Sequence, residues 1–116
     1  MSLATREDIL GIDDRKSVVV NVEAWGGKAV RLMELSYLDN ARISLAMSKA
    51  KDKDETDPLF MARYAAASIV DEQGNRLFSD DDAEALAQKH QSAIFQLWEE
   101  ITKLNKLGST DENVKN

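Results

Sequence analysis

The chain is organised around the stretch Ile69-Val70-Asp71-Glu72-Gln73-Gly74-Asn75-Arg76-Leu77-Phe78-Ser79-Asp80-Asp81-Asp82 and a long helical pattern that follows it. The glycine at its centre, between Gln73 and Asn75, favours a tight turn after a short extended arm. We expect this turn to return Leu77 and Phe78 to the core. Ser79 and the three aspartates after it predict a helix start, because a side-chain oxygen can accept a backbone hydrogen bond there and acids suit the positive helix end.

The helical pattern has two parts. Its apolar phase weakens around Lys89-His90-Gln91-Ser92, which predicts a break or bend. Beyond the break, apolar residues recur at spacings of three and four, as in an amphipathic helix; they are Ile94, Leu97, Trp98, Ile101, Leu104 and Leu107. Gly108 is a stop signal. We therefore expect one domain over residues 1–108 and a disordered tail over residues 109–116.

Upstream of this stretch, the sequence predicts an antiparallel hairpin. Ser17–Trp25 is rich in valine and alternates in polarity, Gly26-Gly27 suits a two-residue turn, and Lys28–Leu35 alternates again. A two-stranded ribbon is marginal by itself, so it must pack on helices or on a partner. Its unpaired edges, together with the apolar stripe of the last helix, predict self-association.

Three further helices are predicted. Thr5 begins a short one that Gly11 limits. A helix from Tyr37 to about Ala50 has an apolar stripe through Leu38, Ala41, Ile43, Leu45, Ala46 and Met47. The charged segment 49–57 then reads as an exposed linker, and Asp57-Pro58 starts a helix that reaches Ile69. The predicted fold is α+β, mainly α, with an N-terminal antiparallel β-hairpin packed on a bundle of about four helices.

Composition excludes several classes of function. At 116 residues with a net charge of -6, the chain suits a small domain and lacks the basic surface that phosphate backbones require. It contains no cysteine, which removes disulfide and thiolate chemistry. A basic, apolar leader and a long apolar run are also lacking. We expect no nucleic acid and no membrane among the partners.

The sequence also gives no sign of a reaction centre. Consecutive acids at 80–82 point about 100° apart on a helix and do not converge on one ion. The acids of residues 52–57 lack the glycine and terminal glutamate of a calcium loop. His90, the only histidine, has no recognised nucleophile or zinc signature beside it. We predict no catalytic residue, no metal site, no cofactor and no enzymatic activity.

Four apolar residues are candidates for binding a protein partner: Trp25, Leu97, Trp98 and Ile101. Aromatic side chains at a hairpin tip or on a terminal helix serve equally as core residues and as interface anchors. For Trp98 the core interpretation is favoured, and for Trp25 both interpretations stay open.

The order of the motifs resembles one protein family over nearly the whole chain. The motifs are Glu23-Ala24-Trp25-Gly26-Gly27, the strand 30–36, Asp57-Pro58-Leu59, the stretch 69–82 and Leu104-Asn105-Lys106-Leu107-Gly108. In this succession they resemble the tail assembly chaperones of bacteriophages and prophages with long, non-contractile tails. The resemblance lies in the succession, because each motif alone is a common turn or helix end.

The resemblance implies a protein of the host bacterial cytoplasm that binds the tape measure protein, keeps it soluble and is absent from the mature virion. It also implies that a frameshifted longer product could contact the major tail tube protein. Two alternatives stay open: a tail completion or connector protein of the virion, and a small hydrolase that uses His90 with distant carboxylates.

Overall fold

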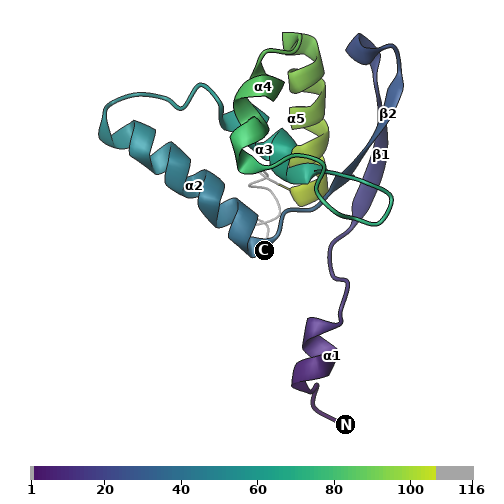
Figure 1. Ribbon diagram of the computed structural model, residues 1–116. Coiled ribbons are helices and arrows are strands. Elements are labelled where there is room, and N and C mark those ends of the chain that lie inside the picture. Colours follow the sequence, from purple (N-terminus) through teal and green to yellow (C-terminus); the bar gives the residue numbers. More distant parts are fainter. Residues whose placement is uncertain (1, 107–116) are drawn as a thin grey trace, which may run out of the picture.

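The computed structural model describes residues 2–106. Figure 1 shows a compact body of helices beside a sheet, with one short helix standing apart from it. Along the chain the elements are α1 (Arg6–Leu10), β1 (Ser17–Val22), the 3-10 turn η1 (Glu23–Trp25), β2 (Lys28–Met33), α2 (Tyr37–Asp52), α3 (Phe60–Ser68), β3 (Ile69–Val70), the 3-10 turn η2 (Asp80–Asp82), α4 (Ala83–Ala87) and α5 (Gln91–Asn105). The predicted fold class, α+β and mainly α, is confirmed.

The predicted hairpin is part of a three-stranded antiparallel sheet in the order β1-β2-β3. β1 and β2 pair with Val20 opposite Val30, and β3 pairs with β2 through Ile69 opposite Leu32. The outer edge of β2 is therefore covered by the chain itself, where the sequence predicted two open edges. β1 remains an edge strand of the described sheet.

The hairpin tip differs from the predicted two-residue turn. β1 ends at Val22, and Glu23–Trp25 form a 3-10 turn before Gly26 and Gly27, whose φ angles are 69° and 78°. Gln96 on α5 contacts this end of β1, where its side chain accepts from the Glu23 N–H at 3.1 Å and donates to the Asn21 carbonyl at 2.9 Å. These bonds hold the tip against α5, while Asn21 and Val22 stay paired with Ala29 and Lys28. β2 likewise ends at Met33, short of the predicted Leu35.

The core is built around α3, which contacts α2, α4, α5 and β2. The alanine run Ala65-Ala66-Ala67 is buried, and such small side chains let neighbouring helices approach closely. α5 contributes Leu97 and Ile101 to this core, and the sheet contributes the buried side chains of Val20, Val22 and Leu32.

Local helix signals are confirmed at several boundaries. Ser79 and Asp82 form a capping box, in which the Asp82 carboxylate accepts from the Ser79 N–H at 2.8 Å. The break after α4 is also confirmed: α5 restarts at Gln91, and the Nδ1 atom of His90 accepts from the Ser92 N–H at 3.1 Å. The predicted stop at Gly108 and the predicted tail over residues 109–116 lie outside the described residues.

The turn after β3 places one residue differently from the prediction. Arg76 bridges to Val70, and the Leu77 N–H donates to the Ile69 carbonyl at 3.1 Å. Because this segment is extended, successive side chains alternate. Phe78 packs against the core as predicted. The expectation that Leu77 is also a core residue is wrong, since its side chain is 58% exposed.

Helix α2 forms where predicted, but most of its apolar stripe is not buried. Ile43 is the one residue of that stripe that is buried, while Leu38, Leu45 and Met47 are exposed. The reason is that α2 packs on α3 along one side only, and it runs outward from the body in Figure 1. The apolar pattern therefore located the helix correctly but did not show which of its apolar side chains are buried.

Candidate protein-binding surfaces

Two of the four candidate binding residues lie inside the core. Leu97 and Ile101 have no exposed surface at all. Both belong to the cluster that joins α5 to α3 and to the sheet. A partner cannot contact either side chain in this conformation, so the apolar stripe of α5 supplies stability.

Trp98 is half-buried and ties α5 to α3. Its ring meets Phe60 edge-on at a centroid distance of 5.3 Å and Tyr64 at 5.1 Å. Such edge-to-face pairs suit the quadrupoles of aromatic rings. Burial also raises the pKa of the Tyr64 hydroxyl. Trp98 thus has the core role that its position on the helix favoured.

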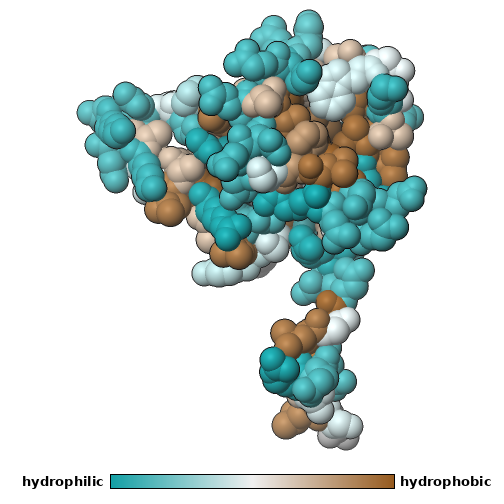
Figure 2. Space-filling model, viewed as in Figure 1, coloured by the Kyte–Doolittle hydropathy of each residue, from teal (hydrophilic) through white to brown (hydrophobic). Residues whose placement is uncertain are grey.

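Trp25 lies half-buried at the hairpin tip and lines an open groove of about 480 Å³, here called the Trp25 groove. The groove separates the tip from α4, and its other lining residues are Lys28, Phe78, Asp82, Ala85, Leu86 and Lys89. Figure 2 shows apolar side chains gathered in the hollow between the helices and the hairpin. The Trp25 groove thus combines an apolar floor with a polar rim, the arrangement of many protein-binding surfaces.

A second groove of about 600 Å³ lies between α2 and α3. Its apolar lining comes from Met47, Phe60 and Tyr64, and polar groups surround it, including Lys51 and Glu55. The sequence pattern placed Met47 and Phe60 among core-facing residues and did not indicate this groove. The pattern that could have indicated it is the distribution of apolar residues around the whole of α2, since a helix with a single buried face has apolar residues on that face only.

The outer face of α2, on the other side of the helix from this groove, is a separate apolar surface. Leu38 and Leu45 are two helical turns apart and therefore share a face; they are 53% and 56% exposed. Ile43 points the other way, into the core. Tyr37, at the start of the helix, is almost fully exposed. We call Tyr37, Leu38 and Leu45 the outer face of α2.

A partly buried ion-pair network fixes α2 to the body. The Arg76 guanidinium donates to the Asp39 carboxylate at 3.1 Å, to the Asp80 carboxylate at 3.0 Å and to the Ala66 carbonyl at 3.2 Å. Asp39 is buried on α2, and Ala66 is buried on α3. One side chain therefore joins α2, α3 and the start of η2, and it orients the outer face of α2 relative to the core.

The second groove is bordered by another ion pair. Arg63 donates to the buried Asp57 carboxylate at 2.7 Å, and the Leu59 N–H donates to the same group at 3.1 Å. Burial by itself raises the pKa of Asp57, but the Arg63 hydrogen bonds, the Leu59 bond and the Arg63 charge together hold it below its usual value. The carboxylate is therefore charged at neutral pH and holds the turn before α3, which begins at Phe60 and not at Pro58 as predicted.

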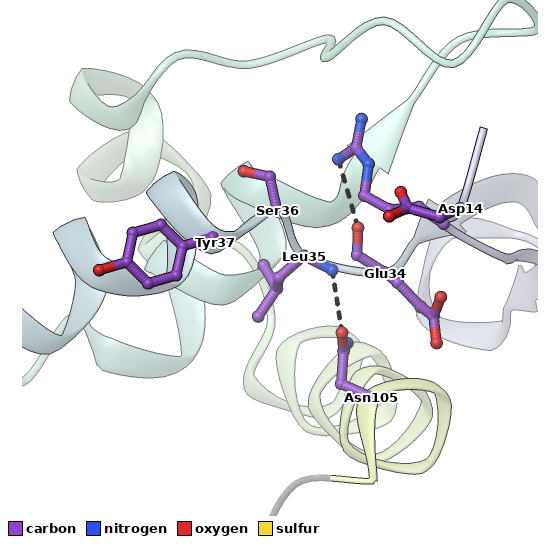
Figure 3. Close-up of a pocket in the computed structure, with 7 residues that line it drawn as sticks. Asp14, Glu34, Leu35, Ser36, Tyr37 and Asn105 are labelled. Atoms are coloured by element: carbon purple, nitrogen blue, oxygen red, sulfur yellow. Dashed lines mark hydrogen bonds between the residues drawn. The ribbon is translucent and has the colours of Figure 1, made fainter. Parts of the chain in front are cut away.

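A polar cavity of about 440 Å³ lies where the sheet meets α2 and the end of α5 (Figure 3). The Asn105 side chain accepts from the Leu35 N–H and donates to the Ile101 carbonyl, both at 2.9 Å. Arg15 donates to the Glu34 carbonyl at 3.3 Å. These bonds hold the chain segments together at the junction, so its polar groups serve the fold.

The acidic and histidine residues weighed in the sequence have structural partners. Asp80 pairs with Arg76 and Arg42, and Asp82 completes the capping box. His90 and Ser92 are exposed, with the Ser92 hydroxyl 2.9 Å from Nδ1 of the His90 ring at the start of α5. Over residues 2–106, no group of three or more His, Asp or Glu side chains is placed to hold a metal ion.

None of the helices within residues 2–106 is both long enough and apolar enough to span a membrane.

Comparison with known proteins gives a likeness in structure alone. No protein-family model matches the chain, and no curated protein matches it in sequence. The solved structure of the bacteriophage HK97 tail assembly chaperone superposes with a TM-score of 0.62, covering 84% of this chain and 90% of that chain at 16% sequence identity. The chain therefore has the fold of that chaperone.

Proposed function

We propose that this chain is a phage tail assembly chaperone that binds the tape measure protein in the host cytoplasm, keeps it soluble and is absent from the finished virion. The observation that carries the proposal is the likeness to the HK97 tail assembly chaperone over most of both chains. The succession of sequence motifs from Glu23 to Gly108 supports the same family.

We assign the outer face of α2 to the tape measure protein. A tape measure protein is long, helical and apolar along one face, so its carrier must offer exposed apolar surface of complementary shape. Leu38 and Leu45 provide such surface on a helix whose opposite side is already anchored by Ile43. Met47 lies on the opposite side of the helix, near Ile43, and lines the α2–α3 groove instead.

The chain's charge suits this role. With a net charge of -6, copies of the free chain repel one another, which opposes aggregation while apolar surface is exposed. No catalytic chemistry enters the proposal, and we expect His90→Ala to leave function intact. A longer frameshifted product, where one is made, would add contacts to the major tail tube protein.

Co-expression with the tape measure protein tests the proposal. The double variant Leu38→Asp/Leu45→Asp places two charges on the outer face of α2 and should abolish co-purification while the chain stays folded. Phe95→Asp is the matched control, because Phe95 on α5 is 53% exposed, close to the 56% of Leu45. Equal loss of binding in both variants, or in neither, would contradict the assignment to α2.

Mass spectrometry of purified phage particles separates the chaperone from a virion component. A chaperone should be absent from particles whose tails are complete. Stoichiometric recovery of the chain from those particles would instead establish the tail completion or connector alternative.

A further inference from the structure

The segment 2–14, here called the arm, carries apolar side chains that pack on nothing in the described chain. It contains α1 and the extended residues on either side of it, and α1 has no buried residue. Leu3, Ile9, Leu10 and Ile12 are each more than half exposed. Figure 1 shows α1 well separated from the body, and Figure 2 shows apolar atoms along the arm.

The arm is nevertheless built as a helix. Thr5 and Asp8 form a complete capping box, with hydrogen bonds of 3.0 and 3.1 Å. These bonds from Thr5 hold the pKa of Asp8 below its usual value. A single isolated turn of helix is marginal in water, because the conformational entropy lost in forming it exceeds the stability gained from its few hydrogen bonds. Packing of Ile9 and Leu10 against another surface would supply the missing stability.

The Trp25 groove matches the arm in both polarity and charge. Its floor is apolar, and among residues 2–106 neither Lys28 nor Lys89 forms an ion pair. The one acid that lines the groove, Asp82, is engaged by the Ser79 N–H. The arm carries four acidic residues and one basic residue. We propose that the arm of one copy docks in the Trp25 groove of a second copy.

The arm's own groove is out of reach. Hydrogen bonds from Arg15 to the Glu34 carbonyl and from the Lys16 N–H to the Glu34 carboxylate fix the base of the arm at the far end of β1. From Arg15 to Val22 the chain rises by about 23 Å at strand spacing. From Arg15 back to Leu10 it spans at most about 17 Å even when fully extended. Ile9 and Leu10 therefore cannot reach the groove of their own chain, and when these side chains fill it they come from another molecule.

This inference does not rest on the proposed function. It uses the groove at the hairpin tip, whereas the tape measure protein is assigned to α2. Variants of the arm should alter self-association, and variants of α2 should alter tape measure binding. The two proposals can therefore fail independently, and the experiments tell the two failures apart.

Sedimentation velocity of the full chain over a concentration series tests whether the arm of one copy binds the Trp25 groove of another, here called arm exchange. The wild-type chain should form dimers or larger species, and Ile9→Asp/Leu10→Asp should raise the dissociation constant by about tenfold or more. This variant touches no buried residue, so its fold is not at risk. Leu45→Asp is the control, an equally exposed apolar residue outside the groove, and should associate as the wild type does.

Mixing two variants gives the sharper result. Ala85→Glu places a negative charge in the groove at an exposed position of α4, while Ile9→Asp/Leu10→Asp removes the arm's apolar contact. Each variant alone should be monomeric at a concentration where the mixture associates, because the mixture retains one intact arm and one intact groove. A mixture no more associated than its components would overturn the proposal.

The absence of cysteine allows a direct test of contact. A chain with Ile12→Cys and a chain with Ala85→Cys, mixed under mild oxidation, should yield a crosslinked heterodimer. Either a strictly monomeric wild-type chain or crosslinking no greater than for an Ile12→Cys and Leu45→Cys mixture would overturn arm exchange and leave the groove to another protein.

Discussion

At the scale of single residues, Arg76 does most to hold the parts of the molecule together. Its guanidinium contacts Asp39, Asp80 and the Ala66 carbonyl, which belong to three separate segments. We expect Arg76→Lys to lower the free energy of unfolding by about 2 kcal/mol, because an ammonium cannot keep this forked geometry and leaves the buried Asp39 poorly paired. Chemical denaturation measures the change.

Arg42 provides the control for this prediction. It contacts the same Asp80 carboxylate at 3.9 Å, but both side chains are about half exposed. Arg42→Lys should cost less than about 0.5 kcal/mol. Equal losses for the two variants would contradict the central role of Arg76.

Asp57 predicts a pH dependence of stability. Its pKa in the folded chain is lowered, so its contribution is complete above the unfolded value of about 3.9 and is lost as the pH falls toward the folded value. Asp57→Asn should therefore cost about 1.5 kcal/mol at neutral pH and progressively less below about pH 4. Denaturant unfolding of both proteins across this range measures the difference.

The exposed Asp52 serves as the charge control. Asp52→Asn removes the same charge from the end of α2 without touching a buried pair, and should change stability by less than about 0.5 kcal/mol at any pH. A difference between wild type and Asp57→Asn that stays constant down to low pH would refute the ion-pair explanation.

Residue-level features were predictable where their causes are local in sequence. The Thr5–Asp8 and Ser79–Asp82 capping boxes and the helix break at His90 depend on residues two or three apart. The Arg76–Asp39 bond joins residues 37 apart, and the Gln96–Asn21 bond joins residues 75 apart. No periodicity or spacing rule connects such pairs, so these contacts could not be predicted from the sequence.

At the scale of elements, the hairpin tip depends on its glycines. Gly27 has φ of 78°, and a Cβ atom there would meet nothing within 4 Å. A side chain at Gly27 would therefore lower stability only through the positive φ, not through a steric clash. We expect Gly27→Ala to lower the free energy of unfolding by about 1 kcal/mol and Gly27→Asn by less, because asparagine tolerates the left-handed region better. Urea denaturation measures both, and an unchanged stability for Gly27→Ala would show that the turn relaxes.

Helix α2 shows what an apolar pattern can and cannot predict. The pattern placed the helix correctly at Tyr37 to about Ala50, and the structure extends it to Asp52. It could not tell which apolar residues face the core, because Leu38 and Leu45 lie opposite Ile43. The same ambiguity hid the α2–α3 groove. Apolar residues on both sides of a helix are typical of a helix that packs against two surfaces. The core is one of them, and the proposed partner would supply the other.

At the scale of the whole molecule, the mainly helical α+β architecture was predictable, whereas its surfaces were not. Element types follow from local periodicity and turn residues, which the stretch 69–82 supplies in order. The third strand, Ile69–Val70, is too short to show a period, so its pairing with β2 was not foreseen. Of the four candidate binding residues, only Trp25 faces an open groove, and Leu97 and Ile101 are core.

The most direct measurement is light scattering of the tape measure protein diluted out of denaturant, with and without this chain. If the chain is its chaperone, the scattering should fall in proportion to added chain and level off at a fixed molar ratio, while Leu38→Asp/Leu45→Asp has little effect. Aggregation that proceeds unchanged at a molar excess of the folded wild-type chain would contradict the proposed function.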